Sequence, residues 1–372
     1  MVRSLGIEPN SRANALDCSR PAAAIFWCVM GAAFAVIAMA GQGADTWASL
    51  LRVGSDNPAL RRMETELGPI STFDSRGHDG QLYYLVARDP FAGGDTVATL
   101  STFDTNPPRY RYRRILFPLL AGGFGHFGGR ITLFTMTFLV ALGMGLATVA
   151  AADIAFNMQL PGGAVFLAAT NVGALVSVVI LTADVLGMGL ALSGLALAVR
   201  RRFGWAICAF ALAGLTKEVY LLVPLSIAAW QWQERRRTVA FLMAVIPFAP
   251  VLLWSVWVWS FVPAIPKTTP LVGWPLLGLL NSVSHWLEQY GDSPVQLGTA
   301  IYVAISFSTV TAMLVVGRSH VLRLVAMPWV ALAACSTGIS VWDVPTNAAR
   351  SFEIVWPVAV LMLAHRVSSP RQ

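Results

Sequence analysis

A polar stretch at residues 73–91 gathers acidic, basic and aromatic side chains in a chain that is otherwise mostly apolar. Within it, Asp79 is followed by Gly80, whose backbone freedom allows a sharp turn. If a helix begins near Tyr83, Asp79 lies at its N-terminus, where the helix dipole favours an ionised carboxylate. An ionised carboxylate suits a general base that removes a hydroxyl proton. A structural N-cap is an equally good interpretation of Asp79.

Two neighbours of Asp79 extend this chemistry. Asp74 lies five residues earlier and is a second candidate catalytic carboxylate, or an oxygen ligand for Mg²⁺ or Mn²⁺; the simpler alternative is a solvated turn residue. His78 is predicted to be a local hydrogen-bonding partner and not a metal ligand, because no second histidine follows at ligand spacing. No metal site is therefore predicted.

Cations and tyrosines alternate from Arg109 to Arg114, just before the apolar run 115–120. Arginine holds phosphate through two parallel hydrogen bonds, so this run is predicted to bind a lipid phosphate. Attraction to anionic headgroups with a belt of tyrosines is an equal alternative.

Single charges also interrupt the apolar part of the chain. Lys217 and Glu218 are adjacent and flanked by apolar residues, and Lys217 is a candidate phosphate contact. Asp184 and Arg350 each stand at the end of an apolar segment, where a helix cap or interface anchor is the alternative. Ionisable groups at or within membrane spans tend to mark functional sites.

The composition identifies the elements that must position these residues. Of 372 residues, 56% are hydrophobic and 12% are charged, whereas a soluble domain carries about 25% charged residues. The mean hydropathy is +0.63. Long uncharged runs recur along the chain, and an all-α polytopic membrane protein with about ten transmembrane helices is predicted. The formal net charge of +7 comes from short arginine clusters, which indicate topology and not nucleic-acid binding.

The spans follow from the apolar runs. The first is predicted at 21–40, as an uncleaved signal anchor, although signal-peptide cleavage after residue 40 is the alternative. Residues 42–130 form a large first outer loop with short helices, which carries the site. The other predicted spans are 131–152, 163–181, 184–199, 204–217, 219–233, 238–260, 297–316, 321–340 and 351–366.

With the N-terminus inside, the arginine clusters at 200–202, 235–237 and 318–323 fall in inner loops, as the positive-inside rule requires. Residues 1–20 and 367–372 become cytoplasmic tails around a single transmembrane domain, 21–366. The chemistry-bearing residues named above then all fall at the outer face. That convergence is what one active site requires.

Three motifs resemble one family. Asp-Gly-Gln-Leu-Tyr-Tyr at 79–84, Arg-Tyr-Arg-Arg-Ile-Leu-Phe-Pro at 111–118 and Leu-Thr-Lys-Glu at 215–218, after a first span and before many more, resemble bacterial members of the GT-C superfamily. These are integral membrane glycosyltransferases that use polyprenyl-phosphate sugars. The paired acidic residues of many members are absent, and so is their large soluble C-terminal domain, which leaves metal dependence and acceptor open.

The resemblance implies an inverting glycosyltransferase in the bacterial plasma membrane, with Asp79 as the general base. Its partners would be a polyprenyl-phosphate sugar donor, a lipid, glycan or protein acceptor, and membrane lipids. No cofactor is predicted, and a divalent cation, Mg²⁺ or Mn²⁺, stays an open alternative. The residues expected to contact substrate are His78, Gln81, Tyr83, Tyr84, Arg111, Arg113, Arg114, Asp184, Lys217, Glu218 and Arg350.

Two other classes of function compete. A transporter or flippase of a lipid-linked sugar would use the same outer cations, but it needs charged or broken helices near the midplane of the membrane. The predicted spans are nearly free of charge at their centres, which favours the enzyme. A non-catalytic subunit of an envelope-assembly complex is the third candidate.

Overall fold

The computed structural model describes residues 47–103, 107–264, 277–290, 292–336, 341–342 and 344–368. In this part of the chain the regular structure is helical, apart from an isolated bridge between Val53 and Gly77. The all-α prediction is therefore confirmed for these residues. The predicted first span at 21–40, the tail 1–20 and residues 369–372 lie outside them, and so does the question of cleavage.

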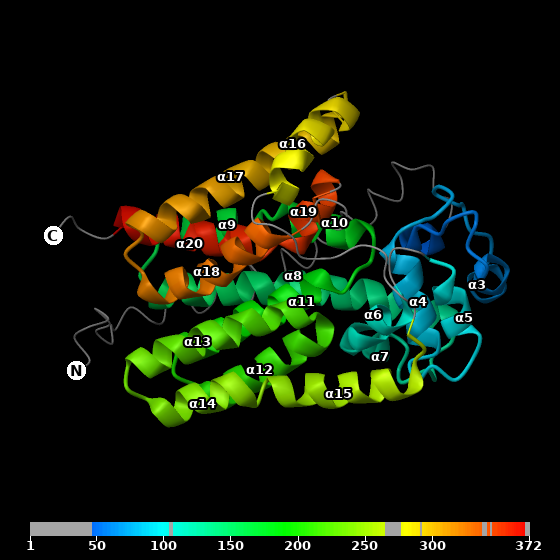
Figure 1. The fold of residues 1–372 in the computed structure, drawn as a ribbon, viewed down its shortest axis with the longest axis horizontal. Helices are drawn as coiled ribbons and strands as arrows, with labels where there is room; N and C mark the ends of the chain where they lie inside the picture. Colours follow the sequence, from blue (N-terminus) through cyan, green and yellow to red (C-terminus); the bar gives the residue numbers. More distant parts are fainter. Residues whose placement is uncertain are drawn as a thin grey trace.

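Helices form the body of the molecule (Figure 1), and several of them are apolar along their length. Within the described residues, three helical segments are long and apolar enough to cross a membrane: α8 (Gly129–Asn157), the segment Arg237–Phe261 that contains α14 (Arg237–Val245) and α15 (Phe248–Phe261), and α17 (Pro294–Val316). Up to five such segments result if each of two bent pairs counts as one span. The chain therefore carries helices suited to a membrane, while the count of ten stays a prediction.

The first bent pair is α9 (Gly162–Ala169) with α10 (Val172–Val179), which meet at 40°. The second is α19 (Pro345–Ser351) with α20 (Val355–Ser368), which meet at 65°. The predicted span 351–366 thus begins within a bend, and its continuous helix starts only at Val355.

The long helices of the body form two groups, and consecutive helices within a group run in alternating directions (Figure 1). In the first, α11 (Asp184–Val199) packs on α8 and on α12 (Phe203–Thr216), and α13 (Leu222–Gln233) packs on α14. In the second, α17 packs on α20 and on α18 (His320–Cys335). The contact between α13 and α18 joins the two groups. The helix α16 (Leu277–Tyr290) packs on α17 and α18.

Glycines bring α8 and α11 close together. A Cβ atom on Gly143 would lie 2.7 Å from the Cα atom of Leu186, and one on Gly189 would lie 2.4 Å from the carbonyl oxygen of Gly143. Small residues that allow two backbones to approach are typical of helix packing in membranes. This contact fixes the position of α11, whose first residue is Asp184.

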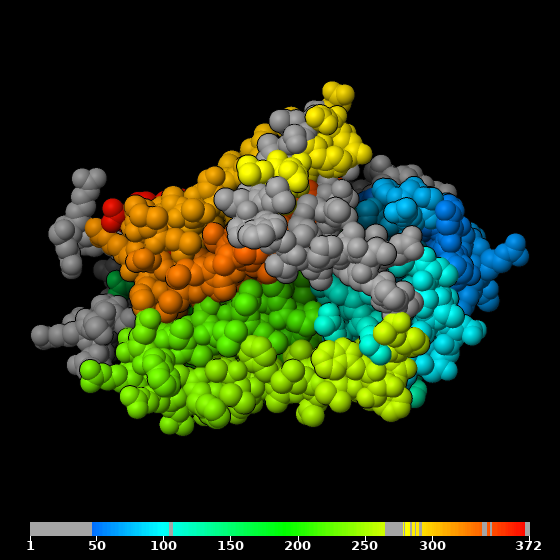
Figure 2. All heavy atoms as spheres, viewed as in Figure 1, coloured from blue at the N-terminus to red at the C-terminus, as the bar shows by residue number. Residues whose placement is uncertain are grey.

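Short helices gather at one end of the body. They are the 3₁₀-helix η2 (Trp47–Leu51), α3 (Leu60–Leu67), α4 (Asp79–Arg88), α5 (Thr96–Ser101), α6 (Pro108–Arg113) and α7 (Leu116–Ala121). Figure 2 shows these blue and cyan segments as a cap over that end. Since α4 and α7 pack against each other and against α8, the cap is tied to the body.

Candidate functional site

The helix α4 begins at Asp79, not near Tyr83, and His78 occupies its N-cap position in an extended conformation. The interpretation of Asp79 as an N-cap is therefore wrong. Its carboxylate is turned instead to two arginines: Arg111 Nη2 lies 2.6 Å from Oδ1, and Arg350 Nη1 lies 2.7 Å from Oδ2. The Asp79 side chain is 19% exposed and Arg111 is fully buried.

Arg350 joins this pair to a second one. Its Nε atom lies 3.6 Å from Oδ2 of Asp184, and the other carboxylate oxygen of Asp184 is paired with Lys217 Nζ. Lys217 has an extended backbone where α12 ends, before the 3₁₀-helix η3 (Glu218–Leu221). That break in the helix turns the ammonium group toward α11.

Glu218 holds the third part of the network. Its Oε1 atom lies 3.2 Å from Nε of Arg113, and its Oε2 atom lies 3.5 Å from Nε of Arg114. The Arg114 guanidinium also lies over the ring of Tyr110, 4.1 Å from its centroid, and cation–π contacts of this kind favour a fixed orientation of the cation.

The structure therefore brings together eight of the predicted site residues from α4, α6, α11, α19 and the segments that follow α6 and α12. Five are cations (Arg111, Arg113, Arg114, Lys217, Arg350) and three are carboxylates (Asp79, Asp184, Glu218). Five cations against three carboxylates leave two positive charges. A phosphate group is the ligand that such an excess suits.

The protonation states near the cap follow from this arrangement. Burial alone raises the pKa of Asp79, but Arg111, Arg350 and Arg114 together hold it well below its usual range. Asp79 is thus ionised at neutral pH. Burial raises the pKa of Tyr83 to about 12, and its phenol therefore keeps its proton.

Tyr83 lies beside the network on the same helix as Asp79. Its buried ring meets Phe117 edge-on, with centroids 5.6 Å apart, and the Arg111 guanidinium lies 5.6 Å from the Tyr83 centroid. The tyrosine thus supports the arginine that holds Asp79.

Two predicted substrate contacts instead hold the cap together. Gln81 is buried, and its Oε1 atom accepts hydrogen bonds from Asn57 and from the Gly54 N–H group. The Tyr84 hydroxyl donates to Glu66 over 2.5 Å. The structure does not bring the polar atoms of Gln81 and Tyr84 to the ion-pair network.

Asp74 and His78 lie in the turn before α4. Asp74 is exposed, and its carboxylate accepts a hydrogen bond from the Gly77 N–H group, as the turn interpretation predicts. His78 is half-buried beside Phe73, with ring centroids 5.0 Å apart, and burial together with the nearby Arg52 lowers its pKa. Among the described residues, no three His, Cys, Asp or Glu side chains are grouped as metal ligands.

Gly80 has a different role from the predicted one. It lies inside the first turn of α4, where a Cβ atom would be 2.5 Å from the carbonyl oxygen of Ile180 and 3.1 Å from that of Leu51. Glycine is needed here for a close approach and not for a sharp turn. The contact sets Asp79 beside the turn that leads to Asp184.

Two residues that the sequence analysis missed, Glu353 and Tyr220, lie beside the network. Glu353 is 1% exposed, and its carboxyl group contacts the hydroxyls of Tyr220 and Ser177. The sequence does contain a sign of its importance, because Glu353 is an ionisable residue inside the predicted span 351–366. Ionisable residues inside membrane spans are functional candidates by default.

Comparisons with models of protein families, with characterised proteins and with solved structures found no match to this chain. The resemblance to the GT-C superfamily therefore rests on the three short motifs alone.

Proposed function

We propose that the protein is an inverting glycosyltransferase of the GT-C type. It moves a sugar from a polyprenyl-phosphate donor to a lipid, glycan or protein acceptor at the outer face of the bacterial plasma membrane. The observation that carries the proposal is the network of five cations and three carboxylates under the cap, at one end of the apolar helices.

The cations act on the donor phosphate. When the bond from the anomeric carbon to the phosphate oxygen breaks, negative charge builds on the departing lipid phosphate. Arg113, Arg114, Lys217 and Arg350 stabilise that charge, and fixed cations in a site of restricted water access give the largest catalytic effect in such reactions. The Arg114 side chain is 10% exposed and Arg113 is 33% exposed, which leaves Arg113 the more accessible of the two.

Asp79 acts on the acceptor. Each of its carboxylate oxygens holds one arginine and keeps a further lone pair for a hydroxyl hydrogen. A carboxylate with a lowered pKa is a weak base, but the oxocarbenium-like transition state makes the attacking hydroxyl acidic as the new bond forms. The acceptor oxygen then bonds to the anomeric carbon from the face opposite the phosphate, and its proton passes to Asp79.

The topology supports this placement of the site. The turns that hold Arg200–Arg202 and Arg235–Arg237 lie at the end of the helices opposite the cap (Figure 1). Arginine-rich turns favour the cytoplasmic side. We therefore place the cap and the network outside, in a fold of about ten membrane-spanning helices with both termini inside.

The test compares wild-type protein with Asp79→Asn in detergent. Each is given radiolabelled polyprenyl-phosphate sugars and a membrane extract as acceptor, and release of the lipid phosphate is followed. Asp79→Asn is expected to lose at least about a hundredfold in rate, the usual contribution of a general base, while donor binding persists. Asp56→Asn is the matched control, because Asp56 is an exposed carboxylate of the same cap. Full activity of Asp79→Asn refutes the base assignment.

A transporter or flippase of a lipid-linked sugar is the second candidate. The bend of 65° between α19 and α20, with Arg350 before it and Glu353 within it, is the feature that favours it, because broken helices form transporter sites. The same assay separates the candidates: donor bound without release of phosphate, together with movement of the donor across proteoliposomes, supports the transporter. Binding with neither event supports a non-catalytic subunit.

A further inference from the structure

A buried carboxyl group that the proposed reaction does not use lies beside the network. Glu353 follows α19 and is 1% exposed. None of the ion pairs within the described part of the chain includes it. An ionised carboxylate buried without a cation is strongly unfavourable.

The hydrogen bonds around Glu353 indicate where its proton lies. The Tyr220 hydroxyl oxygen is 2.7 Å from Glu353 Oε1 and 3.0 Å from the backbone carbonyl oxygen of Asp184. A phenol has one hydrogen, and a carbonyl oxygen only accepts. If Tyr220 donates to the carbonyl of Asp184, its contact with Glu353 is a hydrogen bond only when Glu353 is the donor. Glu353 Oε2 then accepts from Ser177 Oγ, 3.3 Å away.

We propose that Glu353 is held as a neutral carboxylic acid and acts as a positioning residue. Through Tyr220 it fixes the first turn of α11, and with it the Asp184 carboxylate that pairs with Lys217 and Arg350. This inference rests on the proposed function for the role of Asp184. The protonation of Glu353, however, can be measured whether or not the protein transfers sugar.

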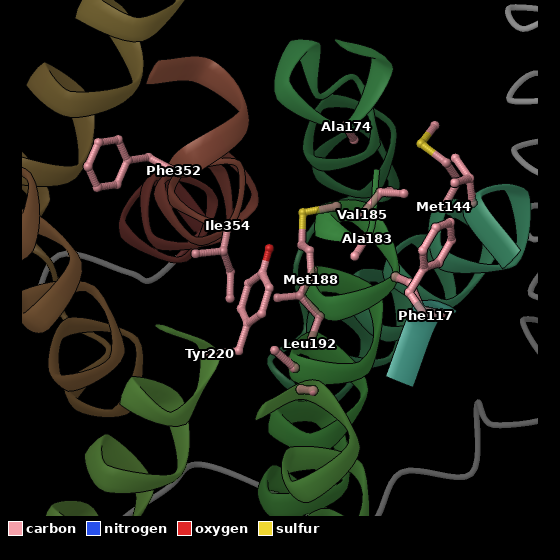
Figure 3. Close-up of a cluster of buried hydrophobic side chains, with 14 of the residues drawn as sticks. Phe117, Met144, Ala174, Ala183, Val185, Met188, Leu192, Tyr220, Phe352 and Ile354 are labelled. Carbon is pink, nitrogen blue, oxygen red and sulfur yellow. The ribbon is translucent and has the colours of Figure 1, made fainter. Parts of the chain in front are cut away.

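Close packing keeps Tyr220 and Glu353 in these positions. A Cβ atom on Gly187 would lie 2.4 Å from the ring of Tyr220, and one on Gly173 would lie 2.8 Å from Cβ of Glu353. Figure 3 shows the Tyr220 hydroxyl directed between Ile354, the neighbour of Glu353, and the α11 side chain of Met188. Because a Cβ atom at either glycine would clash with these side chains, the packing holds the Tyr220 ring and the Glu353 side chain in place.

Neutrality of Glu353 also preserves the charge of the site. With a protonated Glu353 the network keeps two excess positive charges, whereas an ionised Glu353 removes one of them. The titratable side chains that interact electrostatically with the Glu353 carboxyl group are Asp184 on α11, Lys217 and Tyr220 at η3, and Tyr302 on α17. Ionisation of Glu353 draws the hydrogen of Tyr220 to it and releases the carbonyl of Asp184. The rate is therefore expected to fall when Glu353 loses its proton at alkaline pH.

The first experiment measures the proton directly. Infrared difference spectra of wild type and Glu353→Gln, recorded in detergent at neutral pH, are expected to show one protonated carboxyl C=O band in wild type that the variant lacks. The band shifts in D₂O and disappears in an alkaline titration. Absence of such a band from wild type overturns the proposal, because it means that Glu353 is ionised.

The second experiment tests positioning. Glu353→Gln keeps a donor toward Tyr220 and no charge, and its rate of transfer is expected to stay within about threefold of wild type, since one hydrogen-bond donor replaces another. It should also lack the alkaline fall in rate. Glu353→Ala and Tyr220→Phe remove the connection to Asp184 and are expected to lose about tenfold or more.

Two outcomes are decisive. A folded Glu353→Gln as slow as Glu353→Ala, or an unchanged alkaline fall in Glu353→Gln, overturns the positioning role. If no variant and no wild type transfers sugar, the proposed function fails, while the infrared band still decides the protonation of Glu353. Melting temperatures show whether Glu353→Ala is folded, and Glu353→Gln with the wild-type spectrum keeps the test complete if it is not.

Discussion

Removal of the Arg350 cation tests how the two carboxylates at the centre of the network are held. The Arg350 side chain is 15% exposed and lies 2.7 Å from Asp79 and 3.6 Å from Asp184. At these separations each attraction is roughly 5 kcal/mol for an effective dielectric constant of 20, and desolvation offsets much of it. Arg350→Gln leaves two carboxylates short of a partner, which typically costs about 3–5 kcal/mol.

The assay is thermal unfolding in detergent, followed by tryptophan fluorescence. A loss of about 3–5 kcal/mol corresponds to a fall in melting temperature of roughly 4–6 °C in a protein of this size. Arg200→Gln is the matched control, because Arg200 is paired with Asp153 at the other end of α8 and α11 and its side chain is 32% exposed. A partly exposed pair contributes about 1 kcal/mol or less, and a much smaller shift is expected.

A double-mutant cycle gives the result that would refute this reasoning. Asp79→Asn removes one of the two carboxylates that Arg350→Gln leaves without this partner. The loss of unfolding free energy in the double variant should therefore be smaller, by about 1–3 kcal/mol, than the sum of the losses in the two single variants. Additive effects would mean that Asp79 and Arg350 do not interact in the folded protein, and the network would then have no physical basis.

Two further predictions concern the cap. Gly80→Ala forces a Cβ atom against the carbonyl of Ile180 and should lower both the melting temperature and the transfer rate. Gly204→Ala is the control, because its Cβ atom would meet nothing within 4 Å, and it should change neither quantity. Equal effects of the two substitutions would contradict the close approach at Gly80. Burial alone raises the pKa of Glu66, but hydrogen bonds from Arg88 and Tyr84 leave it below its ordinary value. Glu66→Gln should therefore lower the melting temperature at pH 7 by an amount that shrinks as the pH falls through about 4, and a difference independent of pH would argue against an ionised Glu66.

The sequence was sufficient for the features that depend on composition and charge. Uncharged runs of about 18 residues or more are typical of membrane-spanning helices, and the all-α prediction follows from them. Charges at the ends of such runs are costly inside a membrane, so Asp184, Lys217 and Arg350 had to lie at helix ends. In the structure these three residues lie with Asp79 and Arg111 in one group of ion pairs.

Other features depend on tertiary contacts that a linear pattern does not contain. Gln81 and Tyr84 belong to the same motif as Asp79, but they lie on faces of α4 that meet Asn57 and Glu66. A helix turns about 100° per residue, and neighbours in a motif therefore serve different partners. Glu353 was overlooked because its partner, Tyr220, is remote in sequence.

The distribution of charge within the network bears on catalysis as well as on binding. Glu218 is shared by Arg113 and Arg114, which leaves one positive charge there; Asp79 and Asp184 are shared by Arg111, Arg350 and Lys217, which leaves another. The two groups lie close enough for Arg114 and Asp184 to affect each other's charge.

A phosphodiester donor carries one negative charge, and the lipid phosphate that leaves carries two once its bond to the sugar has broken. A site with two uncompensated cations therefore matches the departing group better than the bound donor. Interactions that are stronger in the transition state than in the ground state are the ones that accelerate a reaction. If Glu353 were ionised, one of the two charges would be cancelled and the site would match the donor instead. The neutral state of Glu353 and the proposed transfer of sugar thus depend on the same balance of charge.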